Sequence, residues 1–263
     1  MSQPAPLVTR PFVLVTVAHL LQGLGFASML LLPLLLDHLK ASRSQIGTIM
    51  ATAAVGGLLF RPVVGWALDR VGRKPTIFAG TFFCAVGMGL IGLVDTVGPL
   101  VYVARFTIGV GIGAMFTAYF TLASDVVPPS RRTEGIALFG ISGLLPLLVN
   151  PLAASLDVSG AKVGSFIPIV ALVMLTSLVF LAGVPEPPSA PRSTAGGLRG
   201  VLNALSHRSL RPVWVATIAF AGLVSVFFVF ATVTAEAKGV SMPSKIWLGR
   251  PSESGGELMV LIW

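Results

Sequence analysis

The chain has 263 residues, of which 54% are apolar and 11% charged, and its formal net charge is +8. Soluble domains usually carry about 25% charged residues, so this chain has too few charges to solvate the surface of one or two soluble domains. A basic chain is also typical of nucleic-acid binding, but these basic residues are spread between apolar runs, which excludes nucleic acid as the expected partner. Basic loops between membrane helices account for the same charge.

Seven apolar stretches follow one another along the chain. The first begins after Arg10 and is longer than the roughly 7–15 residues of a signal-peptide core, so it is expected to be an uncleaved helix. Each stretch approaches or exceeds the roughly 20 apolar residues that span a bilayer. They cover residues 11–36, 45–68, 75–95, 99–123, 134–157, 164–184 and 212–234. The sequence therefore predicts an all-α, polytopic membrane protein in contact with the lipid bilayer.

The loops between these spans alternate in charge. The first set holds ten basic residues: Arg10, Arg70, Arg73, Lys74, Arg131, Arg132, Arg192, Arg199, Arg208 and Arg211. The opposite set holds three: Lys40, Arg43 and Lys162. Because basic loops stay on the cytoplasmic side, the N-terminus is expected in the cytoplasm of a multi-pass protein of the cell membrane.

Composition divides the chain into four regions. Residues 1–184 are expected to form a six-helix half, and residues 185–211, rich in Pro, Ser and Gly at first, a cytoplasmic linker. Residues 212–234 form the seventh predicted span, and residues 235–263 an irregular tail. The one cysteine, Cys84, is expected to act as a small hydrophobic residue. The sequence contains no metal-ligand cluster and no catalytic triad, so neither a metal, a cofactor nor an enzyme is expected.

The strongest local signal follows the second span, in the run GWALDRVGRK. Six positions carry it: Gly65, Asp69, Arg70, Gly72, Arg73 and Lys74. Gly65 allows two helices to touch, and Gly72 supplies a tight turn. Asp69 is expected to pair with the neighbouring bases or to face the N-terminus of another helix, as a latch that holds one transporter state. A short basic loop that only follows the positive-inside rule is the simpler interpretation.

In this run the chain resembles the major facilitator superfamily, whose signature loop reads Gly-x-x-x-Asp-Arg-x-Gly-Arg-Lys. Residues 65–74 match every fixed position, and the resemblance covers the seven spans, residues 10–234. It implies two six-helix halves, each an inverted pair of three-helix repeats, around a site near the bilayer midplane. It also implies a small-molecule substrate carried by alternating access, with a coupling proton.

A second match lies in the fourth span, where Arg105 begins a glycine-rich run. A charge within a span costs at least about 2.5 kcal/mol, so it usually faces a cavity or a partner. The resemblance implies that Arg105 serves proton coupling or substrate binding, and the alternative is that it snorkels to the interface. Gly109 and Gly113 share a helix face and are expected to pack against a neighbouring helix.

Two further segments bear on the exporters of this superfamily. The acidic and basic loop from Asp125 to Gly135 is similar to an exporter loop, and it is expected to join Arg70 or Arg73 in a charge network or to form a solvated turn. The fifth span departs from the exporter pattern, because it keeps Asn150 and Pro151 but lacks the paired glycines.

Within the predicted spans, Gln22 and Asn150 join Arg105 as candidates for substrate or proton binding, with helix–helix contact as the alternative. Pro151 is assigned to helix packing.

The expected function is proton-coupled efflux of a small molecule. Because the chain holds one half and one further helix, and its character changes after Thr234, it is expected to be truncated. The alternatives are a half-transporter that acts as a homodimer, and a non-transporting fragment or structural membrane subunit.

Overall fold

The computed structural model describes residues 6–149, 152–153, 156, 158–186, 206–220 and 222–223. Every regular element in these ranges is helical. The chain divides into two compact units, one of Met1–Asn150 with Val158–Gly200 and the other of Pro151–Asp157 with Val201–Trp263. In the second unit, the turn η4 (Arg208–Leu210) leads into helical residues 211–220. The first unit contains the candidate site.

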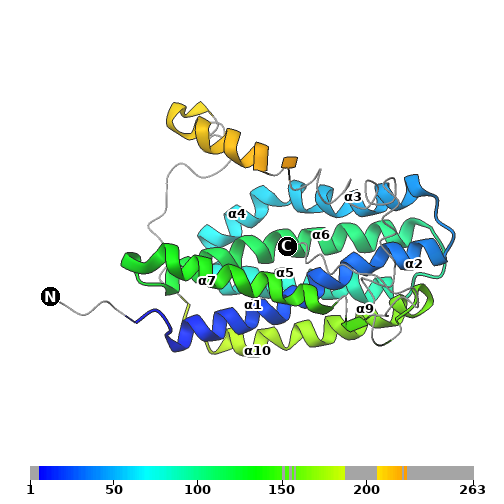
Figure 1. Cartoon of the computed structure of the whole chain (residues 1–263), viewed down its shortest axis with the longest axis horizontal. Coiled ribbons are helices and arrows are strands. Elements are labelled where there is room, and N and C mark those ends of the chain that lie inside the picture. The colour runs from blue at the N-terminus through cyan, green and yellow to red at the C-terminus, as the bar shows by residue number, and fades with distance from the viewer. Residues whose placement is uncertain are drawn as a thin grey trace, which may run out of the picture. The chain divides into compact units, whose positions relative to one another are not determined.

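The first unit is a bundle of long helices that run beside one another (Figure 1). In chain order they are α1 (Arg10–Ser28), η1 (Met29–Leu31), α2 (Leu32–His38), α3 (Arg43–Leu59), α4 (Arg61–Arg70), α5 (Arg73–Ile91), α6 (Pro99–Val126), η2 (Pro129–Arg131), α7 (Arg132–Leu144), η3 (Leu145–Leu148), α9 (Gly160–Leu175) and α10 (Ser177–Ala182).

Proline sets the breaks inside two of the predicted spans. Pro33 stands in the first turn of α2, where its missing N–H interrupts the helical ladder and η1 forms a tighter turn. Pro62 stands in the first turn of α4, and α3 and α4 are bent by 42° at this break. Arg61 therefore stands at the bend, inside the membrane-length stretch from Arg43 to Arg70.

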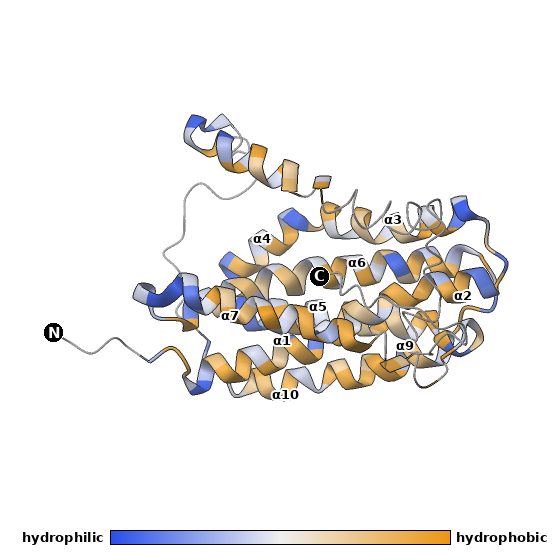
Figure 2. Ribbon diagram, in the orientation of Figure 1, coloured by the Kyte–Doolittle hydropathy of each residue, from blue (hydrophilic) through white to orange (hydrophobic). Residues whose placement is uncertain are grey.

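Within the described ranges, four helical stretches are long and apolar enough to cross a membrane: Arg10–His38, Arg73–Ile91, Pro99–Val126 and Gly160–Ala182. The bent pair of α3 and α4 makes a fifth. Hydrophobic residues fill the bodies of these helices, and hydrophilic residues gather at their ends (Figure 2). The all-α, multi-pass fold is therefore confirmed. The fifth and seventh predicted spans run into residues outside the described ranges and stay predictions, as do the four predicted regions.

Helix α6 is the centre of the bundle and packs most extensively against α5 and α3. Glycine residues on α6 allow its backbone to come close to both helices. A Cβ added at Gly111 would lie 2.5 Å from the backbone N of Cys84 on α5, and one added at Gly109 would overlap the carbonyl of Ala53 on α3. Cys84 itself is fully buried in this contact. Small residues therefore allow the three backbones to approach one another closely.

Candidate functional site

The run from Gly65 to Lys74 turns sharply between α4 and α5. Gly72 has a φ of +116°, a conformation that residues with a Cβ rarely adopt. Helix α5 begins at the next residue, Arg73. The turn thus directs the first residues of α5 back toward the bundle.

Arg73 connects three helices at this end of the bundle. Its side chain is buried, and its Nε lies 2.9 Å from Oδ2 of Asp125 near the end of α6. Its Nη1 also donates to the carbonyl of Leu68 on α4, at 3.3 Å. Of the two pairings expected for the loop that begins at Asp125, the structure shows the one with Arg73. A bond to an ionised partner is roughly twice as strong as a neutral one.

The end of α10 is attached to the start of α5. The Glu186 carboxylate accepts hydrogen bonds from the backbone N–H of Arg73 at 2.7 Å and of Lys74 at 3.1 Å. Lys74 Nζ in turn donates to the carbonyls of Ala182 at 3.2 Å and Val184 at 2.6 Å. An acid therefore satisfies the free N–H groups at the start of one helix, and a base satisfies the free carbonyls at the end of another. The sequence interpretation missed Glu186, although its position directly after an apolar span was a usable signal.

The predicted pairing of Asp69 with its neighbouring bases is not observed in the described part of the chain. Asp69 and Arg70 are exposed, and neither has an ion pair among the described residues. The reason is that Arg73 points inward to Asp125, whereas Asp69 lies on the outer face of α4. Gly65 also has open space where a Cβ would stand, so it makes no close helix contact there.

The exporter-like loop from Asp125 to Gly135 carries a second ion pair. Arg131 Nη2 lies 2.7 Å from Oε1 of Glu134 in the first turn of α7. This hydrogen bond holds the pKa of the Glu134 carboxyl below its ordinary value. Both side chains are partly exposed, so the pair contributes little to stability.

Arg105 is buried inside α6, with 5% of its surface exposed. Its Nη2 donates to the Met50 carbonyl of α3 at 3.2 Å, and its Nε has no partner in the described part of the chain. Because it faces α3 and a pocket rather than the end of α6, snorkelling does not explain its position. Insertion of such a charge costs about 2.5–3.5 kcal/mol.

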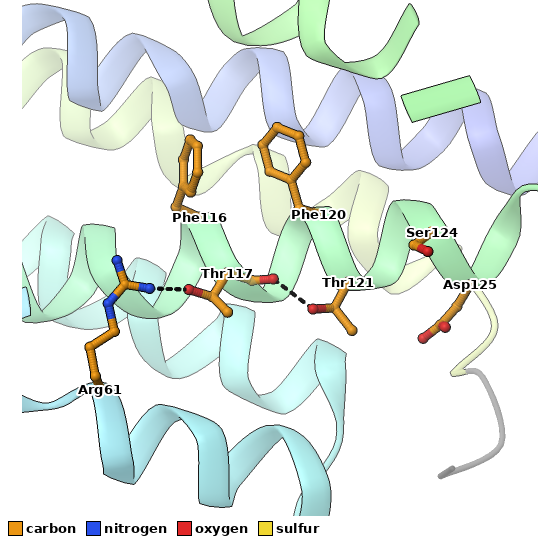
Figure 3. Close-up of a pocket in the computed structure, with 7 residues that line it drawn as sticks. All are labelled: Arg61, Phe116, Thr117, Phe120, Thr121, Ser124 and Asp125. Carbon is orange, nitrogen blue, oxygen red and sulfur yellow. Dashed lines mark hydrogen bonds between the residues drawn. The ribbon is translucent and has the colours of Figure 1, made fainter. Parts of the chain in front are cut away.

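Arg61 is a second cation within the spans, and the sequence interpretation missed it. Its Nη1 donates to Oγ1 of Thr117 at 2.9 Å, so that α4 is joined to α6 (Figure 3). The signal was present, because Arg61 interrupts the apolar run before Pro62. A charge in such a run is a functional candidate by default.

The two arginines line one pocket of about 560 Å³. Its other walls are mainly apolar and come from α1, η1, α3 and α6, with Met29, Leu58 and Ile112 among them. A neighbouring pocket of about 520 Å³ extends along α6 beside Arg61 (Figure 3). It is lined by Arg61, Phe116, Thr117, Phe120, Thr121, Ser124 and Asp125.

No carboxylate neutralises these arginines from the described interior of the spans. The acids in the described ranges are Asp37, Asp69, Asp95, Asp125, Glu134 and Glu186, and all lie in loops or within three residues of a helix end. Asp125 borders the second pocket, but it is bound to Arg73. The pocket thus presents positive charge on an apolar wall.

The remaining candidates are placed differently. Gly109 and Gly113 lie on the face of α6 that meets α3, where they also line the pocket. Gln22 is buried in α1 and lines neither pocket. Asn150 and Pro151 lie outside the described residues.

His19 forms a buried contact between helices. Its Nδ1 lies 2.8 Å from Oγ of Ser142 on α7, and its ring stacks on Phe139 with centroids 4.4 Å apart. The Ser142 hydroxyl donates to the Phe139 carbonyl at 2.6 Å, so its oxygen accepts from Nδ1–H. His19 therefore packs α1 against α7 and lines neither pocket.

The sequence profile of the Major Facilitator Superfamily matches residues 14–260. The chain belongs to this superfamily. The match includes residues 235–260, most of the region that was set apart as an irregular tail. The related proteins are transporters, which places the chain among transport proteins rather than enzymes.

Three comparisons illustrate the relationship. The minor myo-inositol transporter IolF of Bacillus subtilis is 28% identical over 228 residues, which cover 81% of this chain and 50% of that protein. The staphylopine export protein of Staphylococcus aureus is 26% identical over 154 residues, which cover 57% and 37%. The crystal structure of the POT family transporter PepTSo superposes with a TM-score of 0.60 at 19% identity, covering 86% and 49%, and this supports the fold alone. The chain spans about half the length of these relatives, or less.

Proposed function

We propose that the chain forms one half of a secondary transporter that moves a small molecule by alternating access. The observation that carries the proposal is the pocket between α3 and α6 of a superfamily bundle, which is lined by the buried Arg105 and the exposed Arg61. Transporters of this kind bind substrate near the bilayer midplane, where their repeats meet. A charge retained there in spite of its insertion cost marks a substrate or ion pathway.

The proposed location is the cell membrane, with the N-terminus in the cytoplasm. The distribution of basic residues between alternate loops supports this orientation. It places the ion pair of Arg73 with Asp125, and the Glu186 bonds to α5, at the cytoplasmic end. These contacts join α4, α5, α6 and α10, so we assign them to holding this end of the half together while the halves rock.

The proposed direction is outward, in exchange for protons. The outward direction is supported by an export protein among the relatives and by the exporter-like loop at Asp125. Another relative is named as an inositol transporter, so the relatives do not share one solute. Arg105 is the proposed coupling residue of this half. Because the carboxylates of the described spans all lie within three residues of a helix end, the proton carrier is proposed to lie in the second half of the cavity.

The second half of the cavity comes from further sequence or from a second copy of this chain as a homodimer. Chemical cross-linking of the purified full chain distinguishes the two, because only the homodimer gives a cross-linked pair. A non-transporting fragment or structural subunit would insert into membranes and respond to no solute.

The transport proposal is tested in everted membrane vesicles that contain the full chain. An imposed proton gradient is followed by quenching of an acridine dye while a library of small solutes is added. An exchanged solute should dissipate the gradient, and Arg105→Gln should abolish the response while Arg10→Gln, at the start of α1, keeps it. No solute response beyond that of chain-free vesicles would contradict the proposal.

A further inference from the structure

The two arginines act at different depths along α6, on either side of its midpoint. Helix α6 has 28 residues from Pro99 to Val126, so its midpoint falls between Ile112 and Gly113, both of which line the pocket. At 1.5 Å per residue, Arg105 stands about 11 Å from this midpoint on one side. Thr117, which holds Arg61, stands about 7 Å from it on the other. The two cations therefore act on opposite sides of the midpoint of α6.

Both guanidinium groups keep most of their hydrogen-bonding capacity. An arginine has five N–H donors. Arg105 donates one bond to a carbonyl, and Arg61 donates one to a hydroxyl. Neither partner is charged, and Arg105 Nε has no partner among the described residues. A buried, unpaired cation is best satisfied by an anion that brings several acceptors, because guanidinium matches carboxylate and phosphate oxygens in a planar fork.

The other residues that line the pocket determine which chemical class of ligand it can bind. The same pocket is lined by Phe26, Met29, Leu58 and Ile112, and none of its described lining residues is acidic. A permanently cationic solute would face two like charges across an apolar surface. An uncharged solute would leave the buried Arg105 guanidinium without an anionic partner, which is costly for a group shielded from water.

We propose that the substrate is an amphipathic organic anion. Its carboxylate, sulfonate or phosphate group binds Arg105, and its apolar body lies on the wall near Ile112. Arg105 is the main anchor because it is buried and fixed by the Met50 carbonyl. Arg61 is exposed and adds a second, weaker attraction from the other side of the pocket. This inference rests on the proposed transport function and specifies its substrate class.

The test compares probes of one shape and different charge. The full chain is placed in nanodiscs of phosphatidylcholine alone, which excludes an anionic lipid headgroup as the ligand. Binding of dansylglycine, its neutral amide and a dansyl amine cation is measured by fluorescence. The carboxylate should bind about 10-fold to 100-fold more tightly than the amide, because a hydrogen bond to a charged group adds about 1.5–3 kcal/mol.

The variants connect this preference to the residues. Arg105→Gln should remove most of the preference for the carboxylate, Arg61→Gln a smaller part, and Arg105→Lys should restore part of it. Arg10→Gln should retain the preference. Unchanged binding of the neutral amide shows that each variant is folded.

Three results would overturn the inference: no binding of the carboxylate, equal binding of carboxylate and amide, or a preference that survives both glutamine variants. A vesicle response limited to neutral or cationic solutes would also overturn it, while leaving the transport proposal intact. Charge-selective binding without any vesicle response would support the anion site and contradict transport instead.

Discussion

Replacing Asp125 by asparagine tests how the end of the bundle near Gly72 is held together. The substitution keeps the shape of the side chain and removes the negative charge that Arg73 contacts at 2.9 Å. Asp69→Asn is the matched control, because Asp69 is an exposed acid in the same region with no ion pair among the described residues. The sequence motif alone would predict the reverse order of importance.

The expected magnitude follows from burial. The Arg73 side chain is 10% exposed and that of Asp125 is 28% exposed. Removing one partner of a fully buried pair costs about 3–5 kcal/mol. Water reaches Asp125, and the Leu68 carbonyl still accepts from Arg73, so the expected loss is about 2 kcal/mol. Asp69→Asn should change the free energy of unfolding by less than about 0.5 kcal/mol.

The assay is unfolding of the full chain in mixed micelles with rising SDS, followed by the circular dichroism of its helices. A double-mutant cycle with Arg73→Met isolates the pair, and its coupling energy should account for most of the Asp125→Asn effect. Equal destabilisation by Asp69→Asn and Asp125→Asn, or a coupling energy near zero, would contradict a stabilising role for the Asp125–Arg73 pair.

Four further outcomes are expected. Gly109→Leu should prevent folding, because even a Cβ overlaps the backbone of α3, while Gly65→Ala, in open space, should give normal yield of folded chain by size-exclusion chromatography. His19→Ala should cost about 2–3 kcal/mol in the SDS assay, from lost ring packing and the lost hydrogen bond to Ser142, and an effect below about 0.5 kcal/mol would contradict the contact. Glu186→Gln should cost about 0.5–1 kcal/mol, because a neutral amide accepts the bonds at the start of α5 more weakly, and no change would contradict a stabilising role. The Glu134 carboxyl should titrate by NMR below its ordinary pKa, so that its contribution is present near neutral pH and is lost as the pH falls through the lowered value. Arg131→Gln should return that pKa to normal, and an unchanged midpoint would contradict the pair.

The spans were predictable because a bilayer imposes a simple length and composition rule. Predicted residues 99–123 and 164–184 correspond to Pro99–Val126 and Gly160–Ala182. The same rule explains why the predicted span ended before the helix did. Polar residues near a helix end, such as those before Val126, are helical without being apolar.

The arrangement of charges was less predictable, because it depends on which face of a helix each residue occupies. The motif drew attention to Asp69, whereas the structure pairs Arg73 with Asp125, a contact between residues 52 positions apart. Glu186 is more than 110 residues from the helix start it contacts. The sequence offered Arg70 and Arg73 as alternative partners for the loop at Asp125, and only the packing of the helices selects Arg73.

Arg61 was missed for a different reason. It was absorbed into an apolar span, although a charge followed by proline marks both a break and a functional candidate. Only the packing of α4 against α6 shows that it shares a pocket with Arg105. That shared pocket is the basis of both proposals.

The most direct test of alternating access is the accessibility of the pocket from each side of the membrane. Ala54 lines the pocket on α3, and Ala54→Cys introduces an exposed thiol there, while the native Cys84 is fully buried. A membrane-impermeant maleimide is applied to right-side-out and to everted vesicles, with the unmodified chain as the control. Alternating access predicts labelling of Ala54→Cys from both sides. Labelling from one side only, or from neither, would contradict it.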